Sequence, residues 1–156
     1  MSEAASRPRL YLDTNVFIEM FEKRGAVSDR LLDLFRGPTL PRHHLVTSQL
    51  TIAEILVDAI RDDDMQRNDL YLGFLRDIPN LMTVAPISRD VLIRAALIRA
   101  RQPRIKLPDA IHLSTARDEE CRILISNDAR MRSVPYFDEI VPLTREALDR
   151  LLERLA

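Results

Sequence analysis

The stretch Leu10-Tyr11-Leu12-Asp13-Thr14-Asn15 decides the fold that this sequence predicts. Arg9 to Leu12 is typical of a short apolar strand, and the polar triplet that ends in Asn15 follows it directly. Residues 16–21 contain neither Gly nor Pro, so the chain passes straight from strand into helix. Open α/β sheets bind their ligands at the carboxyl ends of parallel strands. Thr14 or Asn15 can cap the helix, which leaves Asp13 to face a ligand; the alternative is that Asp13 is itself the cap.

Composition limits the class of protein. The 156 residues suit one domain over residues 1–156 with a sizeable core, and residues 1–8 are expected to form a flexible tail. A content of 46% apolar and 30% charged residues excludes a disordered chain. The net charge of −1 means that any binding of nucleic acid has to be local. The single Cys121, the polar start and the lack of a long apolar run predict a cytoplasmic protein without membrane contact.

Short strands alternate with helices along the whole chain. Such a pattern predicts an α/β fold with a parallel sheet and helices on both faces, and no repeat or linker indicates a second domain. In the helix expected at 50–61, apolar residues recur at helical spacing and share one face, namely Leu50, Ala53, Val57 and Ile60. The expected strands are 9–12, 45–47, 81–85, 122–126 and 139–141, and the expected helices are 16–21, 27–35, 50–61, 65–77, 88–101, 108–119 and 144–155.

Four acids fall at comparable places on this map. Asp13 follows the first strand, and Asp128 follows the strand at 122–126. Glu54 lies early in the helix after the second strand, and Asp109 lies in the first turn of a helix behind Pro108. Because strand ends and the first turns of the helices share one edge of a parallel sheet, we expect these four acids to converge. Taken singly, Asp109 can be a favourable first-turn acid, Glu54 a solvated helix residue and Asp128 a turn residue.

Converging acids have a chemical consequence. Two carboxylates about 4 Å apart repel by about 4 kcal/mol at an effective dielectric of about 20, so without metal their pKa values should rise. Oxygen ligands without a Cys or His cluster favour Mg²⁺ or Mn²⁺ over zinc. A divalent ion in such a site can activate water and neutralise a phosphoryl group, as in metal-dependent nucleases.

The chain also resembles the PIN-domain ribonucleases, and among them the VapC-type toxins of toxin–antitoxin pairs. The resemblance spans about residues 9–142 and is carried by the segments Leu12–Asn15, Ala53–Glu54, Pro108–Ala116 and Ser126–Asp128. It implies a PIN-like three-layer α/β/α fold, a short-stranded parallel central sheet, and a metal-dependent endoribonuclease. It also implies that Asp13, Asp109 and Asp128 bind Mg²⁺ or Mn²⁺, that Glu54 is a ligand or orients water, and that Asn15 and Ser126 support the site. A small antitoxin and a second copy of the chain are the implied partners.

Two further features bear on partners. The basic loop with Arg101, Arg104 and Lys106 leads into the helix of Asp109, so it suits an RNA phosphate track, although a solvated face is an equal alternative. The first two helices carry six large apolar residues that cannot all face one sheet, so we expect a groove for an amphipathic antitoxin segment, with a simple helix-on-helix core as the alternative. These six are Phe17, Met20, Phe21, Leu31, Leu34 and Phe35.

Other functions fit less well. A PIN-like module that binds RNA or protein without catalysis stays open. A phosphatase with an aspartyl nucleophile would want a second Asp where Asn15 stands, and a phospho-receiver would want a Lys near 140–143, which is absent. His112 lies one turn after Asp109, and since a Mg²⁺ site prefers oxygen we expect it to be structural or to lie at the rim.

Overall fold

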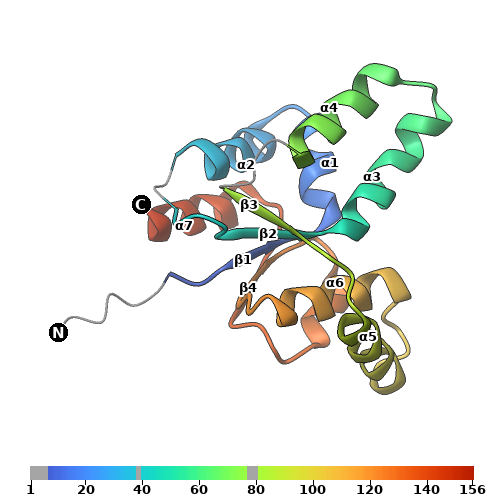
Figure 1. Cartoon of the computed structure of the whole chain (residues 1–156). Helices are drawn as coiled ribbons and strands as arrows, with labels where there is room; N and C mark the ends of the chain where they lie inside the picture. The colour runs from blue at the N-terminus through green and yellow to red at the C-terminus, as the bar shows by residue number, and fades with distance from the viewer. Residues whose placement is uncertain (1–6, 38–39, 77–80) are drawn as a thin grey trace.

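A computed structural model describes residues 7–37, 40–76 and 81–156, and Figure 1 shows its arrangement. Its elements in chain order are β1 (Leu10–Leu12), α1 (Thr14–Glu22), α2 (Ala26–Arg36), β2 (Leu45–Ser48), α3 (Gln49–Arg61), α4 (Met65–Arg76), β3 (Met82–Ala85), α5 (Arg89–Arg101), α6 (Leu107–Asp118), β4 (Ile123–Ile125), the 3₁₀ helix η1 (Ala129–Ser133), β5 (Glu139–Val141) and α7 (Arg145–Leu155). Most of the predicted elements are confirmed within two residues at each end. Residue 77, where the fourth helix was expected to end, lies outside the described residues.

The five strands form one parallel sheet in the order β3-β2-β1-β4-β5. β1 lies in the middle, where Leu10 pairs with Leu45 of β2 on one side and with Ile123 of β4 on the other. The chain builds outward from β1 through β2 to β3 and then returns to the opposite side of β1 with β4. The predicted α/β fold with a short-stranded parallel sheet is therefore confirmed.

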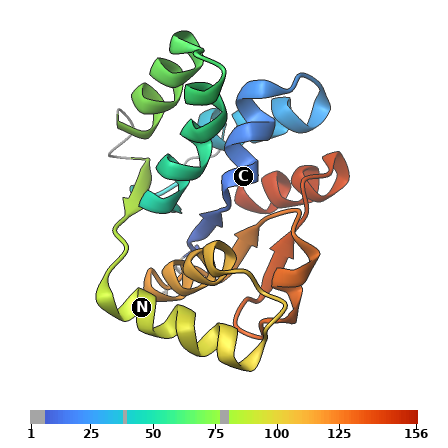
Figure 2. The ribbon, with the colours of Figure 1, turned by 90° about the vertical axis from the view of Figure 1, so that its right-hand side faces the viewer.

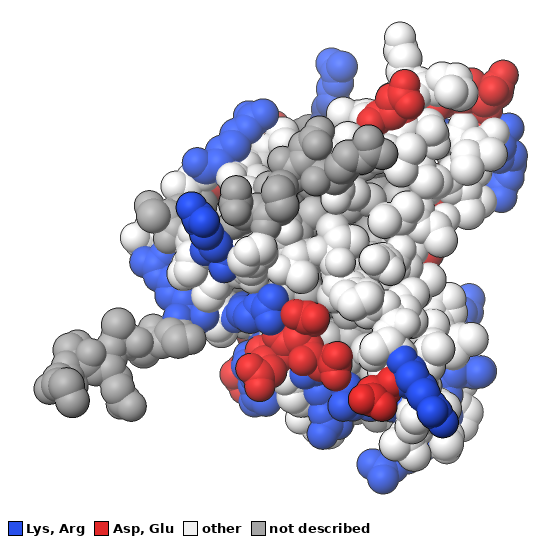
Figure 3. Space-filling model, viewed as in Figure 1, with Lys and Arg blue, Asp and Glu red and all other residues white. Residues whose placement is uncertain are grey.

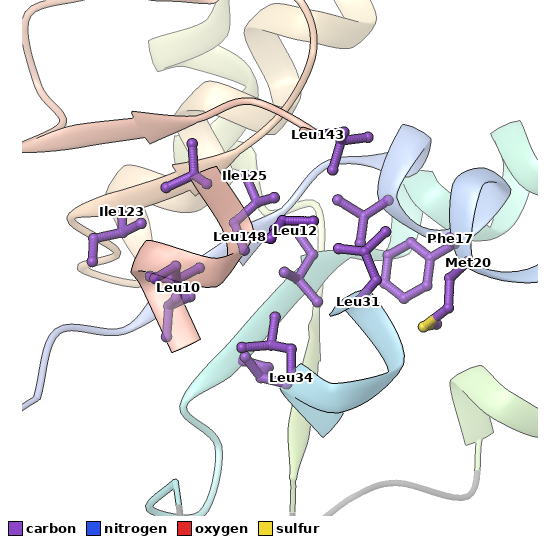
Figure 4. Packing of buried hydrophobic residues seen from close by; sticks show 14 of the residues in the cluster. Leu10, Leu12, Phe17, Met20, Leu31, Leu34, Ile123, Ile125, Leu143 and Leu148 are labelled. Carbon is purple, nitrogen blue, oxygen red and sulfur yellow. The ribbon is translucent and has the colours of Figure 1, made fainter. Parts of the chain in front are cut away.

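Side chains alternate across the sheet and pack against helices on both faces. Leu10 and Leu12 of β1 belong to one core with α1, α2 and α7, and Figure 4 shows Leu12 beside Leu31 of α2. The intervening Tyr11 belongs to the opposite core, which α5 and α6 cover. Figure 1 shows these helices on the two sides of the sheet, so the arrangement has three layers, α/β/α.

The start of α1 corrects one expectation. Neither Thr14 nor Asn15 caps this helix: Asp13 is the N-cap, and its Oδ1 accepts a hydrogen bond from the Thr14 backbone N–H at 2.7 Å. The backbone of Asp13 is extended, with φ −69° and ψ 159°, so the residue ends the strand and starts the helix at once. The capping role uses one carboxylate oxygen and leaves the other for a second contact.

The face of α3 that carries Ala53, Val57 and Ile60 points to solvent, and Ile60 is 67% exposed. The buried residues of the helix are Thr51, Ile55 and Ala59. Large apolar side chains are exposed on α5 as well, namely Leu92, Ile93 and Leu97. Figure 2 looks onto the side of the molecule where α3 and α5 both lie. Two helices on this side therefore keep apolar surface that the described chain does not cover.

The charged residues do not gather into one large basic area on the face drawn in Figure 3. Lysines, arginines and acids lie there in small groups.

The expected tail is only partly described, because residues 1–6 lie outside the described residues. Arg7 donates to the Leu155 carbonyl at 2.7 Å, so the described chain is held from this residue on. Within the described ranges, no helix is long and apolar enough to cross a membrane.

Candidate active site

The site lies where the strand order reverses, at the carboxyl ends of β1 and β4. In parallel sheets such a reversal opens a crevice in which ligands bind. The backbone N–H of Asp13 donates to the Ile125 carbonyl at 3.2 Å, which extends the β1–β4 pairing by one step. Asp13 and the segment from Ser126 to Asp128 are therefore held beside one another by the sheet itself.

Ser126 joins the two strand ends. Its buried hydroxyl donates to Oδ2 of Asp13 at 2.7 Å and accepts from the backbone N–H of Asp128 at 3.0 Å. Oδ1 of Asp13 is already held by the Thr14 N–H, so both oxygens of this nearly buried carboxylate have a donor. The orientation of the Asp13 carboxylate is thus set before any ligand arrives.

Asp109 is the acid of the site with the fewest hydrogen bonds to the described residues. It lies in the first turn of α6, and its Oδ2 is buried without a hydrogen-bond donor among the described residues. Burial raises the pKa of Asp109, and the charges of Asp128 and Asp13 raise the pKa further, against an opposing effect of Arg130. The charges of Asp128 and Asp13 both act on Asp109, so these three acids lie within electrostatic range of one another.

Arg130 lies between two of these acids. Its Nε is 2.9 Å from Oδ1 of Asp128 and its Nη2 is 2.5 Å from Oδ2 of the same carboxylate. The same Nη2 is 3.3 Å from Oδ2 of Asp109, an ion-pair distance without hydrogen-bond geometry. The hydrogen bonds and charge of Arg130 lower the pKa of Asp128 below its ordinary value, despite partial burial.

Glu54 belongs to a partly buried network that adjoins Asp13, because Nε2 of His112 lies 3.9 Å from Oδ1 of Asp13. Oε2 of Glu54 accepts from the Thr14 hydroxyl and lies 2.7 Å from Nε2 of His112. The other ring nitrogen of His112, Nδ1, is 2.7 Å from the Tyr11 hydroxyl. Burial alone would raise the pKa of Glu54, but the hydrogen bond and charge of His112 and the hydroxyl of Thr14 together lower it. His112 is thus a buried partner of Glu54, which the expectation of a structural or rim residue did not include.

The expected rise in pKa holds for Asp109 and is wrong for Glu54 and Asp128, whose pKa values are lowered. Each acid with a lowered pKa has a basic partner, His112 or Arg130, that stabilises its charged form. The sequence places His112 one helical turn from Asp109, which is a usable signal. Arg130 has no such signal, because its position depends on a short 3₁₀ turn after Asp128.

The remaining predicted residues are spread more widely. The Asn15 side chain is exposed and makes no hydrogen bond or ion pair with the described residues, so no supporting role is visible. Arg104 borders a hollow of about 330 Å³ together with Arg130, and the charge of Lys106 contributes to the low pKa of Asp128. Arg101 lines a different hollow of about 450 Å³ beside Arg117 and Tyr136. Arg101 and Arg104 therefore border different hollows.

The donor set suits a hard divalent cation. Asp13, Asp109 and Asp128 offer only carboxylate oxygens, and the buried Oδ2 of Asp109 has no donor of its own. Across the part of the chain that the structure describes, however, no three His, Cys, Asp or Glu side chains are close enough to hold one ion. The guanidinium of Arg130 stands between Asp109 and Asp128, so we infer that the acids fit such an ion once this group gives way.

The opposite pKa shifts predict opposite effects of two substitutions in chelator. A raised folded pKa stabilises the fold below the unfolded pKa of about 4, and this contribution is lost as the pH rises through the folded value. A lowered folded pKa stabilises the fold above about pH 4, and this contribution is lost as the pH falls through the folded value. We therefore expect Asp109→Asn to increase the free energy of unfolding at pH 7, by an amount that shrinks toward about pH 4. Asp128→Asn should decrease it at pH 7 and have less effect in acid.

Urea unfolding between about pH 3.5 and 8 measures both effects. The control is Asp69→Asn, since Asp69 is exposed on α4 and has no ion pair among the described residues. A loss of stability at pH 7 in Asp109→Asn would show that repulsion does not dominate around Asp109.

Comparison with known proteins places this geometry in a family. The PIN domain family model matches residues 10–136, whereas no curated protein sequence matches the chain. The structure is similar to a toxin–antitoxin complex from Klebsiella pneumoniae, with a TM-score of 0.62 and 24% identity over 86% of this chain and 98% of the other. It is also similar to VapBC2 from Rickettsia felis bound to a promoter DNA fragment, with a TM-score of 0.62 and 16% identity over 85% and 97% of the two chains.

A further similar structure is VapC20 of Mycobacterium tuberculosis, a sarcin–ricin loop cleaving toxin. Its TM-score is 0.64 with 12% identity, over 83% of this chain and 97% of the other. Identities this low show a shared fold and no more. The family model, by contrast, covers well over half of the chain and includes all four acids of the site. The chain therefore belongs to the PIN domain family, and its fold is that of the VapC toxins of toxin–antitoxin pairs.

Proposed function

We propose that the protein is a metal-dependent endoribonuclease that hydrolyses RNA phosphodiester bonds and acts as the toxin of a toxin–antitoxin pair. The observation that carries this proposal is the position of Asp13, Asp109 and Asp128 around the carboxyl ends of β1 and β4, with one buried Asp109 oxygen left without a donor among the described residues. PIN domains of the VapC type are generally nucleases, and a site of carboxylate oxygens suits that chemistry.

Asp13, Asp109 and Asp128 would hold Mg²⁺ or Mn²⁺, which when bound supplies positive charge for phosphoryl oxygens and lowers the pKa of coordinated water. The protein prepares these ligands in different ways. Asp13 is fixed through both oxygens by Thr14 and Ser126, whereas Asp109 keeps an oxygen that lacks a donor. Asp13 would thus fix the position of the site, and Asp109 would offer a free oxygen to the cation.

Glu54 suits the handling of water at the same site. Its Oε2 is held by Thr14 and His112, while its Oε1 makes no hydrogen bond with the described residues. The lowered pKa keeps Glu54 ionised at neutral pH, so Oε1 can accept a hydrogen bond from a water molecule and orient it. Tyr11 and His112 act as positioning residues, because they fix Glu54 from the buried side of the network.

RNA would approach from the side of the α5–α6 loop. Arg104 and Lys106 lie near Asp128, where their charge attracts phosphates without a basic surface over the whole molecule. Arg101 borders another hollow, and it would contact RNA only if the bound RNA strand extends along α5. A PIN-like module that binds RNA or protein without cleavage is the alternative, and it predicts binding that the acids do not govern.

The structure leaves fewer apolar residues for the predicted antitoxin groove. Four of the six apolar residues, Phe17, Met20, Leu31 and Leu34, are buried in the core, while Phe21 and Phe35 are partly exposed. Phe21 lines a hollow of about 430 Å³ together with Leu70 and Arg67 of α4 and with Glu22 and Asp64. We propose that an antitoxin segment docks along α1 and α4 here, since several similar structures are toxin–antitoxin complexes.

The exposed apolar residues of α3 and α5 support a homodimer. Soluble monomers rarely expose large contiguous apolar patches, and a twofold contact buries the same surface on both copies. Ile60 on α3 and Ile93 on α5 would be part of this contact. We place the protein in the cytoplasm, where RNA is available and the buried Cys121 stays a free thiol.

The nuclease proposal predicts a sharp loss of activity when an acid is neutralised. Purified protein should cut RNA in Mn²⁺ or Mg²⁺ and stop in chelator, because the cation supplies the charge for the reaction. Asp13→Asn and Asp109→Asn should each lose at least about a hundredfold, or about 2.7 kcal/mol of transition-state stabilisation. Asp69→Asn should keep full activity, which also excludes a contaminating nuclease as the source. Equal cleavage by all four proteins would rule out the assigned site.

The dimer proposal predicts that a charge on α3 or α5 separates the copies. A buried unpaired carboxylate is costly, so Ile60→Glu and Ile93→Glu should each halve the mass measured by light scattering after size exclusion. Leu70→Glu is the matched control, because Leu70 on α4 is 48% exposed and Ile93 is 52% exposed. A wild-type mass that corresponds to a monomer would contradict the dimer.

A further inference from the structure

Arg130 makes the most direct contact between a basic group and the candidate metal ligands. Its guanidinium forms a forked ion pair with Asp128 through Nε and Nη2, and Nη2 also lies 3.3 Å from Asp109 Oδ2. Forked Arg–carboxylate pairs are stronger and more specific in geometry than single contacts. The contact is therefore more than a passing surface charge pair.

Burial shows which side of this contact faces solvent. The side chains of Asp109 and Asp128 are 18% and 14% exposed, whereas that of Arg130 is 43% exposed. The guanidinium thus lies over the two acids from the solvent side.

We propose that Arg130 is a resident counter-ion of the acid site, which occupies the place of a divalent cation between Asp109 and Asp128 and leaves when the cation binds. This inference rests on the proposed metal-dependent function. A divalent cation held by Asp128 Oδ2 and Asp109 Oδ2 would lie beside the guanidinium of Arg130, and the two positive charges repel each other. We therefore expect the cation and Arg130 to compete for these two carboxylate oxygens.

The structure offers a place for the displaced group. Arg130 borders the hollow of about 330 Å³ whose other lining residues are Arg104, Ala129 and Ser133. The side chain of Arg130 is 43% exposed, so it is free on its solvent side to rotate toward this hollow. The displaced guanidinium then lies beside Arg104, so the approach of the cation also gathers positive charge where an RNA phosphate can bind.

A purely structural role is the competing explanation. Asp128 caps η1 by accepting from the backbone N–H of Arg130 at 2.9 Å, and the side chain of Arg130 could merely reinforce this cap. The cap uses the backbone, so it survives replacement of the side chain. Arg130→Ala therefore removes the counter-ion and keeps the cap, which separates the two roles.

Titration of Mn²⁺ into the chelator-treated protein, followed by calorimetry, tests the inference without any RNA. Arg130→Ala should bind Mn²⁺ at least about tenfold more tightly than wild type, because the metal no longer displaces a forked ion pair. The control is Arg132→Ala, since Arg132 lies on the same 3₁₀ helix, is exposed and has no ion pair among the described residues. It reports the general effect of removing one positive charge.

The outcomes separate this inference from the proposed function. Binding by Arg130→Ala alone, or tighter binding than in both wild type and Arg132→Ala, supports the counter-ion. Equal affinity in all three proteins overturns the counter-ion and leaves the metal site standing. Absence of Mn²⁺ binding in every variant overturns the proposed metal-dependent function and the counter-ion with it. Metal-free melting curves show whether each variant is folded.

Discussion

Repulsion among Asp13, Asp109 and Asp128 is the constraint on which the rest of the site depends. Burial raises the pKa of Asp109, and the charges of Asp128 and Asp13 raise it further, because neighbouring carboxylates disfavour one another's charge. The surrounding contacts each reduce this repulsion at a different acid. Ser126 and the Thr14 N–H hold Asp13, and Arg130 holds Asp128. Of the three acids, only Asp109 has a buried oxygen without a donor among the described residues, so it would gain most from a bound cation.

The sheet explains why these acids meet at all. β1 pairs with β2 on one side and with β4 on the other, so residues separated by more than a hundred positions become neighbours at one edge. Side chains that alternate across β1 bind the sheet to helices on both faces, and Tyr11 extends from this strand to His112 on α6. The same strand thus ends in Asp13 and, through Tyr11 and His112, helps to place Glu54.

Much of this arrangement could be predicted from the sequence, because it follows from local pattern. Alternating strands and helices predict the parallel sheet, and acids just after strands or in first turns predict a shared edge. The basic partners could not be predicted in the same way. The contact between His112 and Glu54 depends on how α3 and α6 pack, and the contact of Arg130 with the acids depends on a 3₁₀ turn of five residues. Both partners reverse the expected direction of a pKa.

The orientation of α3 shows a similar limit. Residues 50, 53, 57 and 60 form one apolar face, but Thr51, Ile55 and Ala59 form the buried one. Helical periodicity shows which residues share a face of the helix. It does not show which face packs against the core when a second face is also apolar. An apolar stripe that faces solvent in a single chain is what a partner surface requires.

The central claim is that the crevice between β1 and β4 holds a divalent cation in exchange for the guanidinium of Arg130. Anomalous diffraction from crystals grown with Mn²⁺ tests it most directly, because the signal locates manganese independently of the fitted coordinates. The account predicts a peak bounded by oxygens of Asp13, Asp109 and Asp128, with the side chain of Arg130 turned away from both Asp109 and Asp128. A fully occupied crystal in which manganese lies elsewhere, with Arg130 still bridging the two acids, would contradict it.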